Sequence, residues 1–323
     1  MSEHKVIVYP ITLLPHPNAD TLSLVQILGY TAVVRTADWK PGDLGAYIEP
    51  DYIVPADRPE FTWLAAVSKP ITNNGITGFR VKCKKLRGIM SMGLLIKAPP
   101  GSSPGDDVME KLGVKRYDPD TEITRGLSAQ AIKGPPGFFP KYDVESIYRY
   151  QDTLCPDERV IITEKIHGAN GRYCFRDGQM YCGSRCEWKL EGDSIWWRAL
   201  TPEIRQWCEN NQTRTLYGEV YGQVQDLKYG LTVPKFVIFD VLEDGHWLSF
   251  DAAIRITDGL PWVPILFDGL HKDSDIKAEG QSYLSLVPQI REGIVFKSAT
   301  ERTESRLGRV ILKKVSNEYL ERS

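Results

Sequence analysis

The sequence lacks any apolar run that approaches the roughly 20 residues needed to cross a bilayer, and no signal peptide is recognisable at its N-terminus. We therefore expect no membrane role and a cytoplasmic location, with a nuclear or organellar one left open. An excess of charge of one sign is also lacking, because 40 Lys and Arg face 42 Asp and Glu, for a formal net charge of −2. A nucleic acid, if one is bound, must be held by a local basic groove rather than by global attraction.

Histidine is scarce, with 5 residues, and the 6 cysteines do not suggest a disulfide framework. Cys182 and Cys186 follow Cys174 and could be imagined as zinc ligands, but no histidine or fourth cysteine stands at a ligand-like spacing. Buried, reduced thiols are the favoured interpretation. A zinc site is therefore not predicted.

The chain has 323 residues, which is long enough for two domains of ordinary size. Its first part consists of short β-rich runs separated by Gly, Pro, Asn and Asp clusters, which is typical of a β-barrel or sandwich. A short helix is expected over 108–112, and a dense set of Pro and Gly follows it. We therefore predict a first domain over 1–112, a linker over 113–145 and a second domain over 146–323, with a helix at 144–150.

Two short stretches of the first domain are similar to segments of a known fold. One is His16-Pro17-Asn18-Ala19-Asp20, and the other is Leu86-Arg87-Gly88 with Ser91 and Gly93 after it. Together they resemble the OB-fold barrel of tRNA-binding modules. Such a barrel could bind an oligonucleotide through basic side chains, or the same side chains could simply keep an edge strand soluble. The basic residues in question are Lys82, Lys84, Lys85 and Arg87.

A single lysine in the second part of the chain has an unusual setting. Val160, Ile161 and Ile162 read as a buried strand, so Lys165 would leave the sheet at its end, with small and amide residues shortly after it over 168–171. A deprotonated lysine amine is a nucleophile that could attack a phosphoryl group. Gly168 would allow close approach to a ligand, and Asn170 could hydrogen-bond a sugar hydroxyl. Taken alone, the stretch is equally consistent with a strand that ends in a solvated lysine.

Further charged and aromatic residues follow Lys165 along the chain. Arg185 could offer a planar fork to a phosphate, and Glu219 lies between two glycines on a predicted strand. Phe239 could stack on a base or belong to the core. Glu292 begins an apolar strand that ends at Lys297, and a last strand carries Lys313 and Lys314.

In this order, the residues resemble the motifs of the covalent nucleotidyltransferase superfamily over 160–315. The segment Glu164-Lys165-Ile166-His167-Gly168-Ala169-Asn170 is most similar to ATP-dependent RNA ligases of the T4 RNA ligase 2 type. With the OB-like module, the chain resembles the branch typified by the Naegleria and Deinococcus RNA ligases, which seal 3′-OH/5′-phosphate nicks. The resemblance implies an α+β fold: an N-terminal OB-fold β-barrel, then a nucleotidyltransferase domain of antiparallel sheets with flanking helices.

The resemblance also implies a role for each motif residue. Lys165 would be the nucleophile that forms lysyl-AMP with ATP, the AMP donor, and Mg²⁺ or Mn²⁺ would be the cofactor. Glu219 and Glu292 would hold the metal, with Glu219 also near the ribose. The other implied contacts are Asn170 and Arg185 to ribose and phosphate, Phe239 and Val295 on the two faces of adenine, Glu164 near the adenine edge, His167 and Gly168 on the phosphate side, and Lys297 and Lys313 to the AMP phosphate and the transition state.

The chain departs from the family pattern at two places. The last motif is usually Lys-x-Lys, but Lys313 and Lys314 are adjacent and must point to opposite faces of a strand, so one of them enters the pocket and we expect Lys313. DNA ligases and capping enzymes carry an OB domain after this motif, whereas eight residues follow Val315 here. The β- and γ-phosphates would then be oriented by the N-terminal domain or by a second metal.

The expected partner is RNA with 3′-OH and 5′-phosphate ends, in a nicked duplex, and no oligomer is indicated. A DNA ligase or a capping-type nucleotidyltransferase is the alternative within the enzyme class. A non-catalytic RNA-binding protein built on the OB-like half is the alternative outside it.

Overall fold

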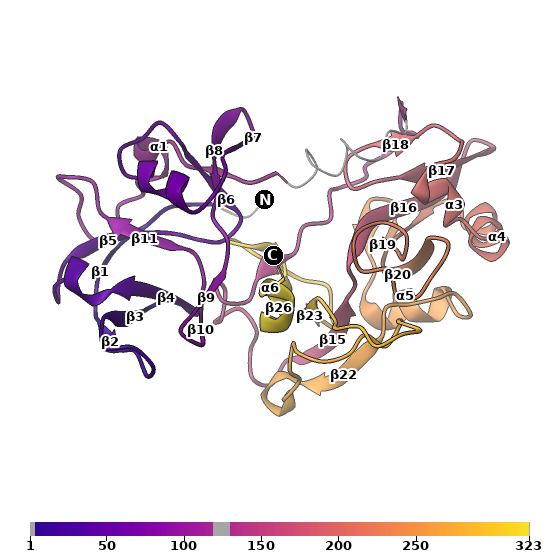
Figure 1. Cartoon of the computed structure of the whole chain (residues 1–323). Coiled ribbons are helices and arrows are strands. Elements are labelled where there is room, and N and C mark those ends of the chain that lie inside the picture. Colours follow the sequence, from indigo (N-terminus) through magenta and orange to yellow (C-terminus); the bar gives the residue numbers. More distant parts are fainter. Residues whose placement is uncertain (1–3, 119–129, 323) are drawn as a thin grey trace. The chain divides into compact units, whose positions relative to one another are not determined.

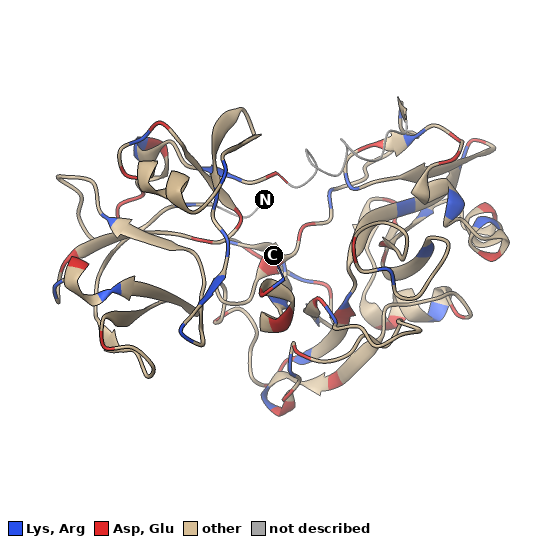
Figure 2. Cartoon of the chain, viewed as in Figure 1, with Lys and Arg blue, Asp and Glu red and all other residues tan. Residues whose placement is uncertain are grey.

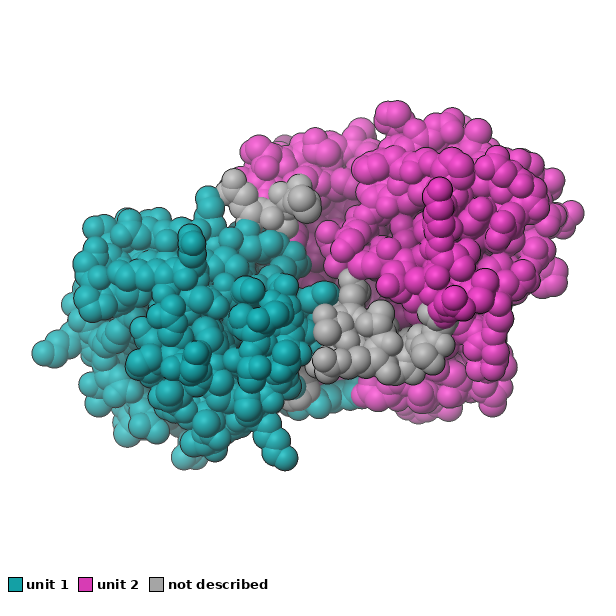
Figure 3. Space-filling model, turned by 90° about the horizontal axis from the view of Figure 1, so that it is seen from above, with its two compact units in different colours: residues 1–122, 148–151, 320–323 teal, residues 123–147, 152–319 magenta. Residues whose placement is uncertain are grey.

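The structure is a computed structural model that describes residues 4–118 and 130–322. The chain divides into two compact units, shown by the sequence colouring of Figure 1 and the two colours of Figure 3. Unit 1 comprises 1–122, 148–151 and 320–323, and unit 2 comprises 123–147 and 152–319. The expected linker over 113–145 stays a proposal, and its residues 119–129 lie outside the described part.

Unit 1 is built from short strands. Its sheets have the orders β1-β5-β11, β12-β6-β8-β7 and β2-β3-β4, with a β9-β10 hairpin. The strand bounds are β1 Val8–Pro10, β2 Leu14–Pro15, β3 Leu22–Ile27, β4 Tyr30–Arg35, β5 Leu44–Ile48, β6 Tyr52–Pro55, β7 Ile71–Asn73, β8 Ile76–Arg80, β9 Lys84–Leu86, β10 Ile89–Ser91, β11 Leu94–Lys97 and β12 Lys115–Arg116. The helical turns are η1 Thr36–Asp38, η2 Thr62–Ala66 and α1 Met109–Leu112, the last within the predicted helix.

Alternation of buried and exposed side chains builds the core of unit 1. In β3 and β4 every second residue is buried, among them Val25, Ile27, Ala32 and Val34, because successive side chains of a strand point to opposite faces. A second cluster lies around Val8, Ile48 and Phe79. Each cluster gathers strands that are distant in sequence.

The two stretches that carried the OB resemblance meet in unit 1. Arg87 and Gly88 form the β9-β10 turn with positive φ values of 48° and 90°, as a two-residue hairpin turn requires. The His16 ring contacts the Leu86 carbonyl at 3.3 Å, and Asn18 Nδ2 donates to the Arg87 carbonyl at 2.9 Å. These residues therefore tie the loop after β2 to the hairpin.

Unit 2 contains a seven-stranded sheet and a five-stranded sheet. The first has the order β13-β18-β17-β16-β19-β20-β21, and the second has the order β14-β26-β23-β15-β22. Their strands are β13 Ala131–Ile132, β14 Glu145–Ser146, β15 Arg159–Lys165, β16 Gly168–Arg176, β17 Gln179–Gly183, β18 Trp188–Lys189, β19 Arg214–Tyr221, β20 Lys235–Glu243, β21 His246–Trp247, β22 Ile265–Leu270, β23 Gly293–Ser298 and β26 Ile311–Val315. The remaining elements are the pair β24 Thr303–Glu304 and β25 Gly308–Arg309, with α3 Ile195–Arg198, α4 Pro202–Asn210, α5 Phe250–Ile256, η3 His271–Asp273 and α6 Asn317–Leu320.

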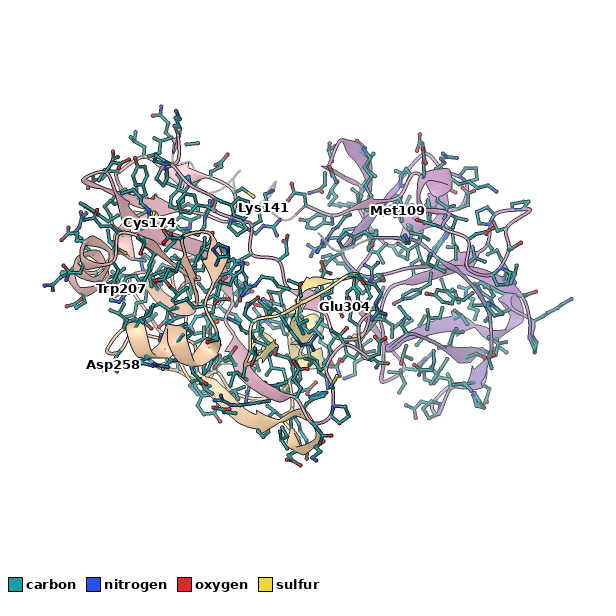
Figure 4. All side chains as sticks on the ribbon, turned by 180° about the vertical axis from the view of Figure 1, so that it is seen from behind. Met109, Lys141, Cys174, Trp207, Asp258 and Glu304 are labelled. Carbon is teal, nitrogen blue, oxygen red and sulfur yellow. The ribbon has the colours of Figure 1, made fainter. Side chains whose placement is uncertain are left out.

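One face of the seven-stranded sheet is covered by helices. The helices α3, α4 and α5 lie beside this sheet (Figure 1). Tyr173, Val220 and Phe236 belong to one buried cluster with residues of these helices. Trp207 of α4, labelled in Figure 4, donates from Nε1 to the Ile256 carbonyl at the end of α5. The helices cover this face, so the opposite face, which carries Asn170 and Glu219, is available to the site.

The helix predicted at 144–150 is wrong. Residues 145–146 form strand β14, which runs parallel to β26 and pairs Ser146 with Lys313. A partner strand more than 160 positions away decides the conformation of this segment, so local pattern could not reveal it.

Candidate active site

Lys165 is the last residue of β15, which lies between β23 and β22 in the five-stranded sheet. Its neighbours across the sheet are Gly293 of β23 and then Val315 of β26. The Lys165 ammonium lies 2.6 Å from Glu292 Oε1, and the Lys165 side chain is 24% exposed. The amine is therefore within reach of a ligand while it is held by a carboxylate.

Strand register decides which lysine of β26 shares the face of Lys165. Directly paired residues of neighbouring strands point to the same face, and positions alternate along each strand. Lys165 pairs with Gly293, Thr163 with Val295, and Val295 with Lys313. Lys313 therefore lies on the Lys165 face, and Lys314, which pairs with Ile294, lies on the opposite one. This register supports the choice of Lys313.

Two matched substitutions test this assignment. We expect Lys313→Ala to lower the rate of AMP transfer from ATP by about 100-fold, because it removes a cation from the face of the nucleophile. Lys314→Ala, one position away, should change the rate less than about threefold. Single-turnover formation of the AMP adduct measures both, and equal losses in the two variants would refute the register argument.

Glu164 is buried, with 1% of its surface exposed, and its Oε2 accepts a hydrogen bond from the Tyr283 backbone nitrogen at 2.9 Å. Burial raises the pKa of this carboxyl above its ordinary value. It pairs with Ile294, on the sheet face opposite to Lys165. The structure thus gives Glu164 a role in holding the 282–283 segment, and its predicted contact with adenine stays a prediction.

His167 is held by three groups that the sequence did not suggest. Asp226 Oδ1 lies 2.8 Å from Nε2, the Tyr319 hydroxyl lies 2.9 Å from Nδ1, and the His167 backbone nitrogen donates to the Tyr229 hydroxyl at 2.7 Å. Nδ1 also lies 3.6 Å from Glu292 Oε2. These contacts fix the imidazole two residues after the nucleophile.

Glu292 and Glu219 form an acidic pair with opposite pKa shifts. Burial would raise the pKa of Glu292, but the Lys165 ammonium and His167 outweigh it and lower that pKa to about 2. Burial raises the pKa of Glu219 to about 8; Lys165 opposes this rise and the Glu292 charge adds to it. The positive charge of Lys165 therefore does not offset the burial of the Glu219 carboxyl.

The donor set around these carboxylates fits a hard divalent cation. Mg²⁺ is typically bound by one or two carboxylates together with substrate phosphates and waters, rather than by a cage of protein ligands. Among the described residues no group of three or more His, Cys, Asp or Glu forms such a cage. Asn170 pairs with Glu219 across β16 and β19, and its Oδ1 is buried without a hydrogen-bond partner in the described part of the chain.

Phe239 occupies a bulge. Tyr217 pairs with Asp240 but the next residue, Gly218, pairs with Ile238, so Phe239 is the extra residue of β20. The ring lies 4.4 Å from the Tyr142 ring, between centroids, and belongs to the same apolar cluster as Val295 of the other sheet. The Phe239 ring and the Val295 side chain were predicted to contact opposite faces of adenine. The bulge brings the Phe239 ring into the cluster that contains Val295.

Lys297 lies farther along β23 and has a partner that sequence reasoning missed. It pairs with Ile161, four residues before Lys165, which is about 13 Å along the strand. Its ammonium lies 2.7 Å from Asp240 Oδ1. The same carboxylate accepts hydrogen bonds from Arg309 at 2.8 Å and from the Tyr142 hydroxyl at 2.9 Å. Burial lowers the pKa of Lys297. The structure thus shows Lys297 in a buried ion network, and its contact with a phosphate stays a prediction.

Arg185 and Gly168 complete the predicted set. Arg185 Nη1 lies 2.5 Å from Asp143 Oδ1, so its fork is held by the segment before β14. At Gly168, a Cβ would meet the Val220 carbonyl of the neighbouring strand, so only glycine allows this close pairing. The Asp177-Gly178 turn, with positive φ at both residues, joins β16 to β17, so that Gly183 pairs with Arg172.

Comparison with known proteins bears on this arrangement. Residues 158–315 match the family model of RNA ligases. Residues 7–98 match an OB-fold domain model. The resemblance to RNA ligases is confirmed over residues 158–315, and the predicted fold class, an OB-fold barrel before a nucleotidyltransferase domain of antiparallel sheets, is confirmed as well.

Solved structures of Naegleria gruberi RNA ligase share the fold over almost the whole chain. A variant with AMP and Mn has a TM-score of 0.80 at 24% identity, with 98% of each chain covered. An apo variant has a TM-score of 0.78 at 26% identity, with 98% of this chain and 97% of that chain covered. A variant with ATP and Mn has a TM-score of 0.78 at 23% identity, with 99% of each chain covered. No curated protein sequence matches the chain.

Within the described residues, no helix combines the length and the apolar character that a membrane crossing needs.

Proposed function

We propose that the protein is an ATP-dependent RNA ligase that joins a 3′-OH end to a 5′-phosphate end through a lysyl-AMP at Lys165. The observation that carries the proposal is the position of Lys165 at the end of β15, 2.6 Å from Glu292 and on the same sheet face as Lys313. The RNA ligase family match and the likeness to ligase structures with ATP or AMP and Mn support it.

The first step requires an unprotonated Lys165. The Glu292 carboxylate favours the ammonium form, which has no lone pair, so the amine must release a proton and turn from Glu292 to the α-phosphorus of ATP. The nitrogen–phosphorus bond then forms as the bond to pyrophosphate breaks, and the nitrogen loses a second proton. Lys313 on the same face would stabilise the charge on the phosphate oxygens.

The two later steps move the AMP. An oxygen of the RNA 5′-phosphate attacks the lysyl-AMP phosphorus, the phosphorus–nitrogen bond breaks, and Lys165 takes back its protons. The 3′-OH oxygen then attacks the activated 5′-phosphate, loses its proton, and AMP leaves. Phe239 and Val295, from the two sheets, would hold adenine, and Arg185, Asn170 and His167 would hold the ribose and phosphates.

Glu219 and Glu292 are the residues that would hold Mg²⁺ or Mn²⁺. When bound, the cation supplies positive charge beside both carboxylates and the phosphates. The raised pKa of Glu219 supports this assignment, because a cation at this position would relieve the unfavourable burial of its negative charge. Glu164 and Gly168 are proposed contacts of the nucleotide, Lys297 remains a proposed phosphate contact through its network, and Lys314 is proposed to lie outside the pocket.

The OB-fold unit offers a basic surface for RNA. Lys82, Lys84, Lys85 and Arg87 are exposed on and around the β9-β10 hairpin, and Lys85 forms an ion pair with Glu321 at 2.7 Å. Elsewhere Lys and Arg are interspersed with Asp and Glu in both units (Figure 2). A local patch of this kind is what a chain with balanced charge needs to hold a polynucleotide. A cytoplasmic location is proposed, in keeping with six cysteines that are all free thiols.

Nicked duplexes test the RNA assignment. We expect the protein to seal a nick whose 3′-OH strand ends in ribonucleotides and to seal an otherwise identical all-DNA nick at least tenfold more slowly, because hydroxyl-binding groups reject a substrate that lacks the 2′-OH. Product formation on a denaturing gel measures both rates. Equal sealing of the two nicks would support a DNA ligase instead, and AMP transfer without any sealing would point to a capping-type enzyme.

A further inference from the structure

Arg172 lies on β16, two residues after Asn170, and therefore on the same sheet face. Its residue surface is only 3% exposed. Nε donates to the Ser184 carbonyl at 2.7 Å, and Nη1 donates to the Phe139 carbonyl at 3.3 Å. The guanidinium carbon lies 4.6 Å from the centroid of the Trp188 ring. One side chain thus joins three segments that are separated along the chain.

The surroundings of Arg172 are unusual for a buried charge. A buried guanidinium ordinarily pairs with a carboxylate, because taking a charge out of water is costly. Over residues 4–118 and 130–322, the structure records carbonyl, tyrosine and ring contacts for Arg172 and no ion pair with a carboxylate. Stability alone does not account for such a residue, since a well-packed apolar side chain would fill the same space without that cost.

The segments that Arg172 joins carry proposed nucleotide contacts. Ser184 is directly followed by Arg185, and the segment that begins at Phe139 continues to Asp143, the partner of Arg185. The same segment, which the label of Lys141 locates in Figure 4, contains Tyr142, whose ring packs on Phe239. A planar guanidinium with its donors in fixed directions can hold both segments at once. The positions of the Arg185 guanidinium and of the Phe239 ring therefore depend on the Arg172 side chain.

We propose that Arg172 is a positioning residue of the nucleotide pocket, which sets the Arg185 turn and the Phe139–Asp143 segment against each other. The inference rests on the proposed function, since it takes ATP as the ligand of this pocket. It predicts that loss of Arg172 weakens ATP capture without touching the nucleophile, because Lys165 lies on the other sheet.

The test compares Arg172→Met with Arg176→Met. Arg176 is a matched control, because it lies on the same face of β16 and also donates to carbonyls, those of Phe175 and Arg214, away from the proposed contacts. The initial rate of AMP transfer from ATP to the protein, measured over a range of ATP concentrations, separates the half-saturating ATP concentration from the maximal rate. Circular dichroism melts report the folded fraction.

We expect Arg172→Met to raise the half-saturating ATP concentration about tenfold, because a misplaced contact lowers complementarity to the bound ligand, and Arg176→Met to leave it unchanged. A merely structural role would reduce the folded fraction and the maximal rate at an unchanged half-saturating concentration. Arg172→Lys keeps the charge and is measured if the Met variant fails to fold; we expect an increase of about threefold, because one ammonium cannot hold both carbonyls. If the wild-type protein transfers AMP, this inference is overturned by an unchanged half-saturating ATP concentration in the folded Arg172 variants, or by an equal rise for Arg176→Met. If the wild-type protein does not transfer AMP, the proposed function is overturned as well.

Discussion

Lys165→Ala is expected to abolish transfer of AMP from ATP to the protein, with a loss of at least ~10³-fold, because no other group can take the place of a covalent nucleophile. Lys165→Arg should be as inactive. Its guanidinium can still pair with Glu292, so the charge of the site is kept, but it stays protonated and cannot attack phosphorus. Labelling with ATP that carries ³²P at the α-position measures both variants.

The two variants separate chemistry from local electrostatics. In Lys165→Ala, Glu292 loses the partner at 2.6 Å that helps to hold its pKa near 2, so it faces Glu219 without compensation. In Lys165→Arg this compensation persists. Inactivity of both, with unfolding curves close to wild type for the Arg variant, supports a nucleophilic role. Labelling of either variant at full stoichiometry would show that another residue accepts the AMP.

Asp240→Ala should destabilise unit 2 by about 3–5 kcal/mol, because it leaves buried cations without their counter-charge. Asp240 has no exposed surface. Its carboxylate forms ion pairs with Lys297 at 2.7 Å and Arg309 at 2.8 Å, and it accepts a hydrogen bond from the Tyr142 hydroxyl at 2.9 Å. Arg309 also lies 3.8 Å from the Trp247 ring centroid, so the network spans β20, β21, β23 and β25. Denaturant unfolding followed by tryptophan fluorescence measures the change.

An exposed ion pair provides the comparison. Glu304→Gln breaks the contact with Arg306 at the surface and should leave the unfolding curve where it is. Burial would raise the pKa of Asp240, but Lys297 and Arg309 outweigh it and hold that pKa below its ordinary value. The stabilisation from this carboxylate is therefore present at neutral pH and lost as the pH falls through the lowered folded-state pKa. An Asp240→Ala protein as stable as the wild type would show that the network does not contribute.

The sequence could predict the parts of the site that lie within single strands. The apolar run before Lys165, the position of Glu292 directly before β23 and the alternation within β26 are local patterns, and the structure has Lys165 on β15 and Lys313 on β26, with β23 between these two strands. The hairpin between β16 and β17 also has a local signal, because Asp177-Gly178 favours a two-residue turn.

Contacts between the sheets were not visible in the same way. Lys297 pairs with Asp240 of the other sheet, and His167 contacts Asp226, Tyr229 and Tyr319, three residues separated from it by loops or strands. No spacing rule connects such positions. A signal existed at Asp240, since a carboxylate within an apolar strand requires a buried partner. Arg172 offered the same signal on β16.

The most direct test of the central claim is the intact mass of the wild-type protein after incubation with ATP and Mg²⁺ or Mn²⁺, followed by peptide mapping of the product. The account predicts a mass increase of one AMP, located on the peptide that contains Lys165 and lost on incubation with RNA that carries a 5′-phosphate. An unmodified mass under these conditions, or an AMP attached to any residue other than Lys165, would contradict it.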